Sequence, residues 1–403
     1  MKVLVVGSGG REHALAWRLA RSPLLGELHA APGNPGIAQL GPCHPVRAED
    51  GDGLLALCRA LGIDLAVVGP EAPLVAGVAD LLRRSGIAVF GPSAEAARIE
   101  GSKQFAKEAM RAAGVPTAAT LSVARPPCVL KADGLFAGKG VYVCHTDAEL
   151  DAGLRAVAAL GGPYVIEELL EGPELSLFAL SDGSHALPLP PAQDFKRLED
   201  GDAGPNTGGM GSYSPVPGID RARVEELVEL VHRPVLAELA RRRTPFAGLL
   251  FAGLMLTADG PRVLEFNARF GDPETQSILP RLEGDLLAAL AAAAGGELRG
   301  VELGESSDAA VTVTLAAGTY PAAGDRGTPI DGVAEAEAAG ALVFHAGTAL
   351  QGSRLVTNGG RILNVTGLGA DVAQARERAY AAAERISFAG ARYRTDIAEV
   401  VHA

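Results

Sequence analysis

The first 90 residues alternate short apolar runs with helix-forming stretches, and this alternation restricts the fold more than any other feature of the chain. The apolar runs are "KVLVV" (2–6), "ELHAAP" (27–32), "IDLAVVGP" (63–70) and "IAVFGP" (87–92). Nearly continuous apolar strands joined by helices indicate a parallel sheet that is covered on both faces. We therefore predict a doubly wound α/β domain, with ligands at the carboxyl ends of its strands.

The rest of the chain changes pattern twice, which indicates further domains. A chain of 403 residues exceeds the size at which single hydrophobic cores stop growing, so two or three domains are expected. Residues 117–190 have the pattern of a small sheet with one helix, and a long helix, a strand pair and an Ala-rich helix follow. A β-rich segment with a closing helix begins near residue 309. The predicted domains are 1–100 (N-terminal α/β), 101–300 (central, with a lid subdomain at about 118–190) and 301–403 (β-rich C-terminal).

The charge and composition argue against several classes of function. The 36 basic and 48 acidic residues give a net charge of -12 without a basic stretch, so we expect neither nucleic acid nor an anionic membrane as a partner. No stretch reaches the roughly 18 apolar residues of a membrane helix, and the N-terminus does not resemble a targeting peptide. The four cysteines are well separated without a C-x-x-C pair, which is typical of a reducing cytosol. We expect a cytoplasmic protein.

The stretch "VLKADGLFAGKGVYV" (129–143) holds two lysines, Lys131 and Lys139, around a loop of mostly small residues. If strands flank the loop, their alternation sends Val129 and Lys131 to the same face. The glycines let backbone N–H groups approach an anion closely, which favours a phosphate ligand. The chain has no G-x-x-x-x-G-K-[ST] sequence, so a nucleotide site here is not a P-loop. The alternative is a flexible hairpin with two solvated lysines.

The stretch "VLEFNARFGDPETQ" (263–276) concentrates oxygen ligands. Strand alternation places Glu265 and Asn267 on one face, which suits Mg²⁺, because this ion takes a carboxylate, further oxygens and phosphate oxygens. An amphipathic strand with a polar outer face is the alternative. Arg269, Asp272 and Glu274 surround the Gly-Asp-Pro turn that follows, and charges in such a turn favour a role with a substrate.

Two other stretches give weaker signals. In "VIEELLEGPELS" (165–176) a carboxylate is placed to receive ribose hydroxyls, and the apolar residues suit a purine. "GSGGRE" (7–12) lies between a strand and a helix and is typical of a phosphate-binding turn. The second strand ends in Ala30, Ala31 and Pro32 without an acid for a ribose, which disfavours a dinucleotide. His13, His145 and His345 lack ligand-like partners in the sequence and are interpreted as packing or surface residues.

Taken together, the motifs resemble the phosphoribosylamine-glycine ligase family, also called glycinamide ribonucleotide synthetases, of the ATP-grasp superfamily. They run in the family's order over nearly the whole chain: "VVGSGGREHALAW", "AAPGNPG", "VVGPEAPLVAGV", "GSKQFAKEAM", "KADGLFAGKGV", "VIEELLEGPELS", "GPNTGGMGSYSP", "VLEFNARFGDPETQ", "FHAGT" and "VTNGGRILNVTGLG". The resemblance implies a central ATP-grasp domain and an enzyme of purine biosynthesis. Its reaction would convert ATP, glycine and 5-phosphoribosylamine to ADP, phosphate and glycinamide ribonucleotide through glycyl phosphate.

The resemblance also implies roles for individual residues. The ATP-binding residues would be Lys103, Lys131, Gly138, Lys139, Gly140, Glu168, Leu169, Leu170 and Glu174. Glu265 and Asn267 would hold Mg²⁺ or Mn²⁺. The catalytic residues would be Lys131, Arg269, Asp272 and Glu274. The substrate-binding residues would be Gly9, Gly10, Arg11, Glu12, Gly33, Asn34, Pro70, Glu71, Asp194 and Pro273. Only small-molecule partners are implied, and the chain is expected to be a monomer or a small homo-oligomer.

The chain departs from the family pattern in the lid and in two motifs. Two segments of the lid are shorter than usual, the family's "QDHKR" reads "QDFKR" with Phe195, and "GGYP" reads "GTYP" at 318–321. Another ATP-grasp ligase, of purine or biotin-linked carboxylation chemistry, is the nearest alternative, and "RFGDPETQ" with "TNGGR" argues against it. A non-catalytic nucleotide-binding regulator is the alternative of another class. Intact Lys103, Lys131 and Arg269 argue against this second alternative.

Overall fold

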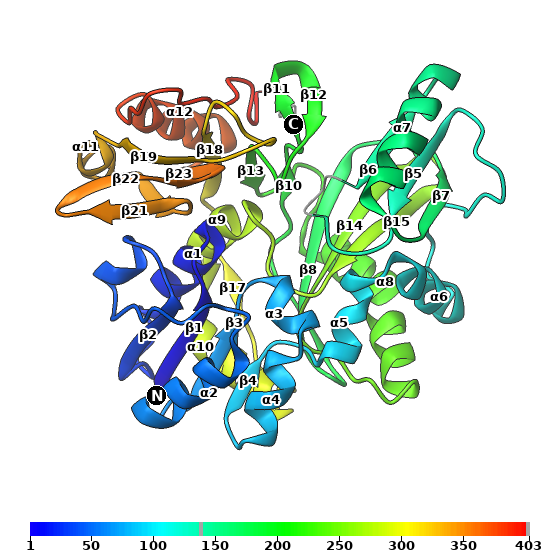
Figure 1. Ribbon diagram of the computed structural model, residues 1–403. Helices are drawn as coiled ribbons and strands as arrows, with labels where there is room; N and C mark the ends of the chain where they lie inside the picture. Colours follow the sequence, from blue (N-terminus) through cyan, green and yellow to red (C-terminus); the bar gives the residue numbers. More distant parts are fainter. Residues whose placement is uncertain (137–139, 400–403) are drawn as a thin grey trace.

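The computed structural model describes residues 1–136 and 140–399. Its first segment is a parallel sheet in the order β2-β1-β3-β4 (blue in Figure 1). The strands are β1 (Lys2–Gly7), β2 (Glu27–Pro32), β3 (Leu65–Val68) and β4 (Ala88–Phe90), and the helices are α1 (Gly10–Leu19), α2 (Gly51–Leu61), α3 (Glu71–Val75) and α4 (Val78–Arg84). Val3 and Val5 pack with α1, whereas Leu4 and Val6 pack with α2 and α4. The predicted doubly wound sheet is therefore confirmed.

Helices α5 (Ala94–Gly101) and α6 (Lys103–Ala113) connect this sheet to the next part of the chain. The side chain of Ser93 accepts a hydrogen bond from the backbone N–H of Ala96 and so caps the N-terminus of α5. Ser102 caps α6 in the same way through the N–H of Phe105, and Gly114 ends α6 with a φ of 69°. A φ of this sign is accessible to glycine without strain. Lys103 therefore occupies the first position of a capped helix.

The central segment contains two separate sheets. A small sheet in the order β6-β5-β7 is covered by α7 (Asp147–Leu160), and a second sheet has the order β15-β14-β8-β9. The strands are β5 (Cys128–Ala132), β6 (Val141–Cys144), β7 (Tyr164–Glu168), β8 (Glu174–Asp182), β9 (Ala186–Pro188), β14 (Ala247–Thr257) and β15 (Gly260–Asn267). The long helix α8 (Arg221–Arg241) packs against β8, β9 and β14.

The prediction of one small sheet over 117–190 is wrong, because β8 and β9 belong to the second sheet. Leu175 and Leu177 on β8 contribute to one hydrophobic core, and Phe178 and Leu180 contribute to another. A strand with apolar residues on both faces needs cover on both, and pairing with β14 provides it. The small sheet β6-β5-β7, which we call the lid sheet, therefore ends at Glu168.

The C-terminal segment (gold to red in Figure 1) completes the molecule with two antiparallel sheets, one of which also includes the green strands β10 and β13. One sheet has the order β10-β13-β18-β23-β20 and the other has the order β19-β22-β21. The strands are β10 (Gln193–Asp194), β13 (Gly211–Ser214), β18 (Ala309–Ala316), β19 (Asp325–Pro329), β20 (Leu342–His345), β21 (Thr348–Gln351), β22 (Arg354–Gly359) and β23 (Arg361–Gly369). Helices α11 (Val333–Ala338) and α12 (Val372–Ala383) accompany them. Because β10 and β13 come from the central segment, this sheet joins two parts of the chain.

Further short strands and helices complete the fold of the described residues. They are the hairpin β11 (Arg197–Glu199) and β12 (Ala203–Asn206), the short helix α9 (Glu274–Ile278), the strand pair β16 (Leu282–Glu283) and β17 (Gly304–Glu305), and α10 (Leu286–Gly295). The Ala-rich helix α10 packs with α1 in the core on one face of the N-terminal sheet. In the described part of the chain, none of the helices has the length and hydropathy that a membrane crossing would need.

Candidate active site

Two adjoining cavities, of about 240 and 400 Å³, lie where the N-terminal sheet, the lid sheet, the second central sheet and the C-terminal segment meet. After the ligands that the sequence analysis predicts, we call them the substrate cavity and the nucleotide cavity. Both cavities are lined by Lys131, Glu167, Asp194, Lys196, Thr207, Leu264 and Glu265. Arg11 and Glu71 from the N-terminal sheet and Arg361 from the C-terminal segment border only the substrate cavity. Residues that are far apart in the sequence therefore meet at one site.

Lys103 and Lys131 both line the substrate cavity, Lys103 from α6 and Lys131 from the lid sheet. The Lys103 ammonium donates to the carbonyl of Gly134 at 3.1 Å, and burial lowers its pKa although Glu265 and Asp133 oppose this effect. The Lys131 ammonium donates to the carbonyl of Leu264 at 2.9 Å. Gly138 and Lys139, which the sequence also predicts here, lie outside the described residues. The predicted convergence of Lys103 and Lys131 on one cavity is thus observed.

The nucleotide cavity is lined by both apolar and charged side chains. Leu169 and Leu170 line it together with residues of the lid sheet and of β14 and β15: Val129, Val141, Val143, Met255 and Leu264. The carboxylate of Glu168 accepts from the backbone N–H of Ala119 at 2.7 Å, which fixes the start of this segment. At the other end, Glu174 forms an ion pair with Lys196 at 2.6 Å. Apolar walls with a few polar groups are typical of small-molecule sites.

Glu265 and Asn267 lie on one face of β15 and both line the substrate cavity, as the alternation predicts. Leu264 forms a β-bulge, since Gly253 faces Glu265 but Leu254 faces Val263. Burial opposes ionisation of Glu265, yet Lys196, Lys131 and Lys103 lower its pKa. Glu265 is therefore a half-buried carboxylate that three lysines hold in its charged form.

Arg269 lies in a network of charges between the N-terminal sheet and the second central sheet. Its guanidinium pairs with Glu71 at 3.2 Å and with Glu100 at 3.0 Å, and Arg11 lies 3.9 Å from Glu71. Burial opposes the ionisation of Glu71, but Arg269 and Arg11 lower its pKa to about 2. Burial raises the pKa of Glu100, against the effect of Arg269. The network thus holds two arginines beside the substrate cavity.

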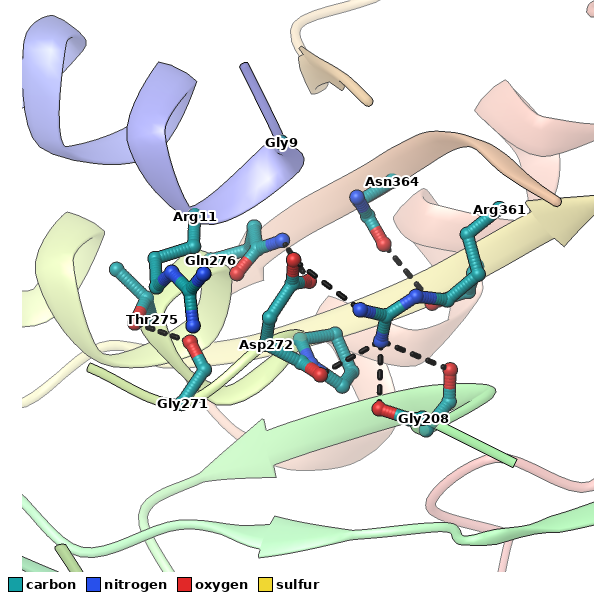
Figure 2. Close-up of polar contacts among 12 residues, drawn as sticks. Gly9, Arg11, Gly208, Gly271, Asp272, Thr275, Gln276, Arg361 and Asn364 are labelled. Carbon is teal, nitrogen blue, oxygen red and sulfur yellow. Dashed lines mark hydrogen bonds and ion pairs between the residues drawn. The ribbon is translucent and has the colours of Figure 1, made fainter. Parts of the chain in front are cut away.

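The turn at Asp272 and Pro273 is anchored by Arg361 from β23 (Figure 2). One Arg361 nitrogen, Nη1, donates to the carbonyls of Asp272 and Gly208, each at 2.6 Å, and Nη2 lies 3.2 Å from the Asp272 carboxylate. Gln276 donates to the other Asp272 oxygen at 2.8 Å. Glu274 accepts from the Ser176 hydroxyl at 3.1 Å, and burial raises its pKa. The C-terminal segment therefore holds the predicted catalytic turn in place.

Asp194 lies at the border of the two cavities. Burial raises its pKa to about 8, against the effect of Lys196 and with the help of Glu274 and Glu174. Phe195, which follows it, packs against the C-terminal core and stacks under Arg394 at 5.0 Å. Phe195, which stands where the family pattern has His, therefore lies against the C-terminal segment.

Among the described residues, several of the predicted substrate-binding residues line neither cavity. Glu12 accepts from the Gly9 N–H and from Arg11 Nε, both at 2.6 Å. Asn34 donates to the carbonyls of Ser8 and His345 at 2.9 and 2.8 Å. Of the predicted set, Gly10 and Glu12 lie in the first turn of α1, Gly9 and Pro70 directly precede α1 and α3, Gly33 and Asn34 follow β2, and Pro273 directly precedes α9. Arg11, Glu71 and Asp194 reach the cavity.

The sequence analysis missed Lys107, Glu100, Lys196 and Arg361, which all line the substrate cavity. Lys196 follows directly on Asp194 and Phe195, so its neighbours gave a local signal. Arg361 ends "TNGGR", a motif that was used only to identify the family. Lys107 and Glu100 lie on helices whose amphipathic pattern gives no sign of a site. His13 and His345 are buried in packing positions, whereas His145 is exposed, as predicted.

Comparison with known proteins gives one consistent result. The N domain, the ATP-grasp (A) domain and the C domain of phosphoribosylglycinamide synthetase match residues 1–100, 101–275 and 310–400. Phosphoribosylamine-glycine ligases of Streptomyces coelicolor and Agrobacterium fabrum are 54% and 49% identical to the chain, over 99% and 98% of it and of their own lengths.

Solved structures agree with the sequence matches. The phosphoribosylamine-glycine ligase of Thermotoga maritima superposes with a TM-score of 0.83 at 36% identity, covering 98% of this chain and all (100%) of that one. The biotin carboxylase domain of the Hydrogenobacter thermophilus 2-oxoglutarate carboxylase has a TM-score of 0.70 at 16% identity, with 97% and 91% covered, and shares the fold alone. The chain belongs to the phosphoribosylglycinamide synthetase family.

Proposed function

We propose that this chain joins glycine to 5-phosphoribosylamine at the expense of ATP, in purine biosynthesis, and forms glycinamide ribonucleotide, ADP and phosphate. One observation carries the proposal more than any other. In a single pair of adjoining cavities, lysines suited to phosphates meet a charged carboxylate and a network of two arginines. Membership of the family supplies the identity of the substrates.

The reaction needs two displacements. A carboxylate oxygen of glycine attacks the γ-phosphorus of ATP, the new O–P bond forms, and the bond to ADP breaks. The amine of phosphoribosylamine then attacks the carbonyl carbon of glycyl phosphate, the C–N bond forms, phosphate leaves with the C–O bond electrons, and the amine loses a proton. The nucleophiles come from the substrates, so the enzyme acts through position and charge.

The charged residues divide these tasks. Lys103 and Lys131 neutralise the transferring phosphoryl group, and Arg269 holds an anionic oxygen of glycine or of its acyl phosphate. Asp272 and Glu274 position glycine, which accepts the phosphoryl group, beside Arg269. We extend the phosphate-binding role to the loop with Gly138, Lys139 and Gly140. Adenine binds beside Glu168, Leu169 and Leu170, and Glu174 receives the ribose.

Phosphoribosylamine binds on the side of the N-terminal sheet. Arg11 and Glu71 contact it, and its pocket includes the turns at Gly9, Gly10 and Glu12, at Gly33 and Asn34, and at Pro70. Asp194 and Pro273 complete the substrate-binding set. The separate domain matches support 1–100, 101–300 and 301–403 as the functional division.

The ATP-grasp domain implies ATP and a divalent metal, and Glu265 with Asn267 fit a hard cation. Among the described residues, no group of three or more His, Cys, Asp or Glu side chains could hold a metal. A cation at Glu265 and Asn267 must therefore take its remaining ligands from phosphate and water, as Mg²⁺ and Mn²⁺ do. When bound, the cation offsets negative charge on the phosphates. We propose Mg²⁺ or Mn²⁺, a cytoplasmic location, and a monomer or small homo-oligomer.

The test of this proposal is the substrate requirement for ADP release. Purified protein is incubated with Mg-ATP and glycine, with or without phosphoribosylamine formed in place from ribose 5-phosphate and ammonia. We expect rapid ADP release only with both substrates, together with the mass of glycinamide ribonucleotide. Turnover with bicarbonate or another acid in place of glycine would refute the proposed substrates.

A further inference from the structure

Three buried charged side chains meet where the lid sheet joins the rest of the central segment. Lys107 on α6 lies 2.9 Å from one carboxylate oxygen of Glu167 on β7, and Lys131 on β5 lies 2.8 Å from the other. The three side chains are 7%, 2% and 8% exposed. We call them the Lys107–Glu167–Lys131 triad. Ions buried this deeply are stable only when they are paired and hydrogen-bonded, and both Glu167 oxygens meet this condition.

The strand register explains one half of the triad. Val129 on β5 faces Glu167 on β7, and Lys131 follows Val129 by two residues. Lys131 and Glu167 are therefore diagonal neighbours on the same face of the lid sheet, within reach of long side chains. The other contacts of the triad connect the lid sheet to α6, which carries Lys107, and to β15, where the Leu264 carbonyl accepts from the Lys131 ammonium.

The donors of the two lysines are used differently. The Lys107 ammonium donates to the Thr117 hydroxyl at 2.9 Å and the Ala118 carbonyl at 2.7 Å, in addition to its pair with Glu167. An ammonium has three N–H bonds, so these partners saturate Lys107. Lys131 has two partners among the described residues, Glu167 and Leu264, and it lines both cavities. One N–H bond of Lys131 thus remains for a ligand.

We propose that Lys107 is a positioning residue for ATP, which acts through Glu167 on Lys131. Lys107 fixes one oxygen of the carboxylate, so that the other oxygen holds the Lys131 ammonium at the border of the two cavities. Without Lys107, the Glu167 charge has only Lys131 to pair with and the carboxylate is free to turn. Lys131 is then drawn toward Glu167, and ATP must compete with this pair. The inference rests on the proposed function of Lys131 in phosphate binding.

Two simpler explanations make different predictions. If the triad only docks the lid sheet, loss of Lys107 lowers thermal stability and leaves the affinity for ATP unchanged. If Lys107 acts only as a positive charge near the phosphates, its loss weakens ATP equally whether or not Glu167 is charged. Positioning through Glu167 requires instead that the effect of Lys107 depends on the Glu167 carboxylate.

A double-mutant cycle with Lys107→Met and Glu167→Gln separates these cases. The dissociation constant of Mg-ATP is measured by calorimetry, and kcat/KM for ATP and KM for glycine are measured in steady state. We expect Lys107→Met to weaken ATP binding and to lower kcat/KM for ATP by about 10- to 100-fold. KM for glycine should change by less than about twofold, because the proposed action of Lys107 through Glu167 and Lys131 is on ATP and not on glycine. In the Glu167→Gln background, the same change should cost less than about threefold.

The control is Lys2→Met, which removes an exposed ion pair with Glu27 at 2.9 Å and should leave all three values unchanged. Lys107→Arg provides a second variant in case Lys107→Met does not fold, since it keeps the charge but its planar fork does not fit three acceptors around one nitrogen. It should also weaken ATP in a manner that depends on Glu167. Equal losses in both backgrounds, or lower stability with unchanged ATP affinity, would overturn the inference. Calorimetry of Mg-ATP needs neither glycine nor phosphoribosylamine. A wild-type protein that binds ATP but makes no product would therefore refute the proposed function and leave the inference about Lys107 standing.

Discussion

Arg361 lets the role of the C-terminal segment be tested with one substitution. Arg361→Met removes the guanidinium and with it the contacts to the carbonyls of Asp272 and Gly208 and to the Asp272 carboxylate. Hydrogen bonds to a charged donor contribute about 1.5–3 kcal/mol each, and because one of the two contacts to carbonyls is exposed, we take the lower value for each and expect a destabilisation of about 3 kcal/mol. At about 2.1 cal/mol/K per residue, the unfolding entropy of a chain of 403 residues is about 0.85 kcal/mol/K, so Tm should fall by about 3–4 °C.

The same substitution should affect catalysis, because the turn that Arg361 holds carries Asp272 and leads into Glu274. A misplaced turn is expected to lower kcat/KM by about 10²-fold. Thermal unfolding by circular dichroism and coupled ADP release measure the two effects. Arg354→Met is the matched control, since Arg354 lies on the neighbouring strand β22 and is 62% exposed, 3.9 Å from Asp331. It should change Tm by less than about 1 °C. Similar shifts in the two variants would refute the proposed role of Arg361.

Three further substitutions test other parts of the account. A Cβ at Gly10 would lie 2.6 Å from Gln276 Nε2 and even closer to Asn364, so Gly10→Ala should lower the free energy of unfolding, measured by urea denaturation, by about 1–3 kcal/mol. The control is Gly295→Ala, whose Cβ would meet no atom within 4 Å and should cause no such loss. Equal losses in the two variants would contradict the packing argument. Glu265→Gln should lower kcat at least about 10²-fold and change its dependence on Mg²⁺, and an unchanged metal titration would exclude Glu265 as a ligand. The pKa of Glu71 is lowered from 4.5 to about 2, so its stabilisation is present above about pH 4.5 and is lost as the pH falls toward 2. Glu71→Gln should therefore be less stable at pH 7 and show a weaker decrease of stability between those pH values, and an unchanged acid profile would contradict this.

Local patterns predicted the elements and several pairs of site residues. Two-residue periodicity placed Glu265 and Asn267 on one face of a strand, and both line the substrate cavity. The bulge at Leu264 was not predictable, because it depends on how β14 and β15 align. It turns the Leu264 carbonyl into the acceptor for Lys131.

Contacts between distant segments were the part that the sequence could not supply. The meeting of Arg361 with Asp272 spans 89 residues, and that of Lys107 with Glu167 depends on how α6 docks on the lid sheet. The assignment of β8 failed for a related reason. The apolar pattern marks a buried strand but does not say which strand it pairs with, and only the pairing with β14 separates the two central sheets.

The central claim is that ATP activates the glycine carboxylate, and oxygen transfer tests it most directly. Glycine labelled with ¹⁸O in both carboxylate oxygens is incubated with Mg-ATP, phosphoribosylamine and the protein, and the products are analysed by mass spectrometry. Attack of the carboxylate on the γ-phosphorus predicts one ¹⁸O in each released phosphate and one in the amide of glycinamide ribonucleotide. Unlabelled phosphate, released while glycine keeps both labelled oxygens, would contradict the account.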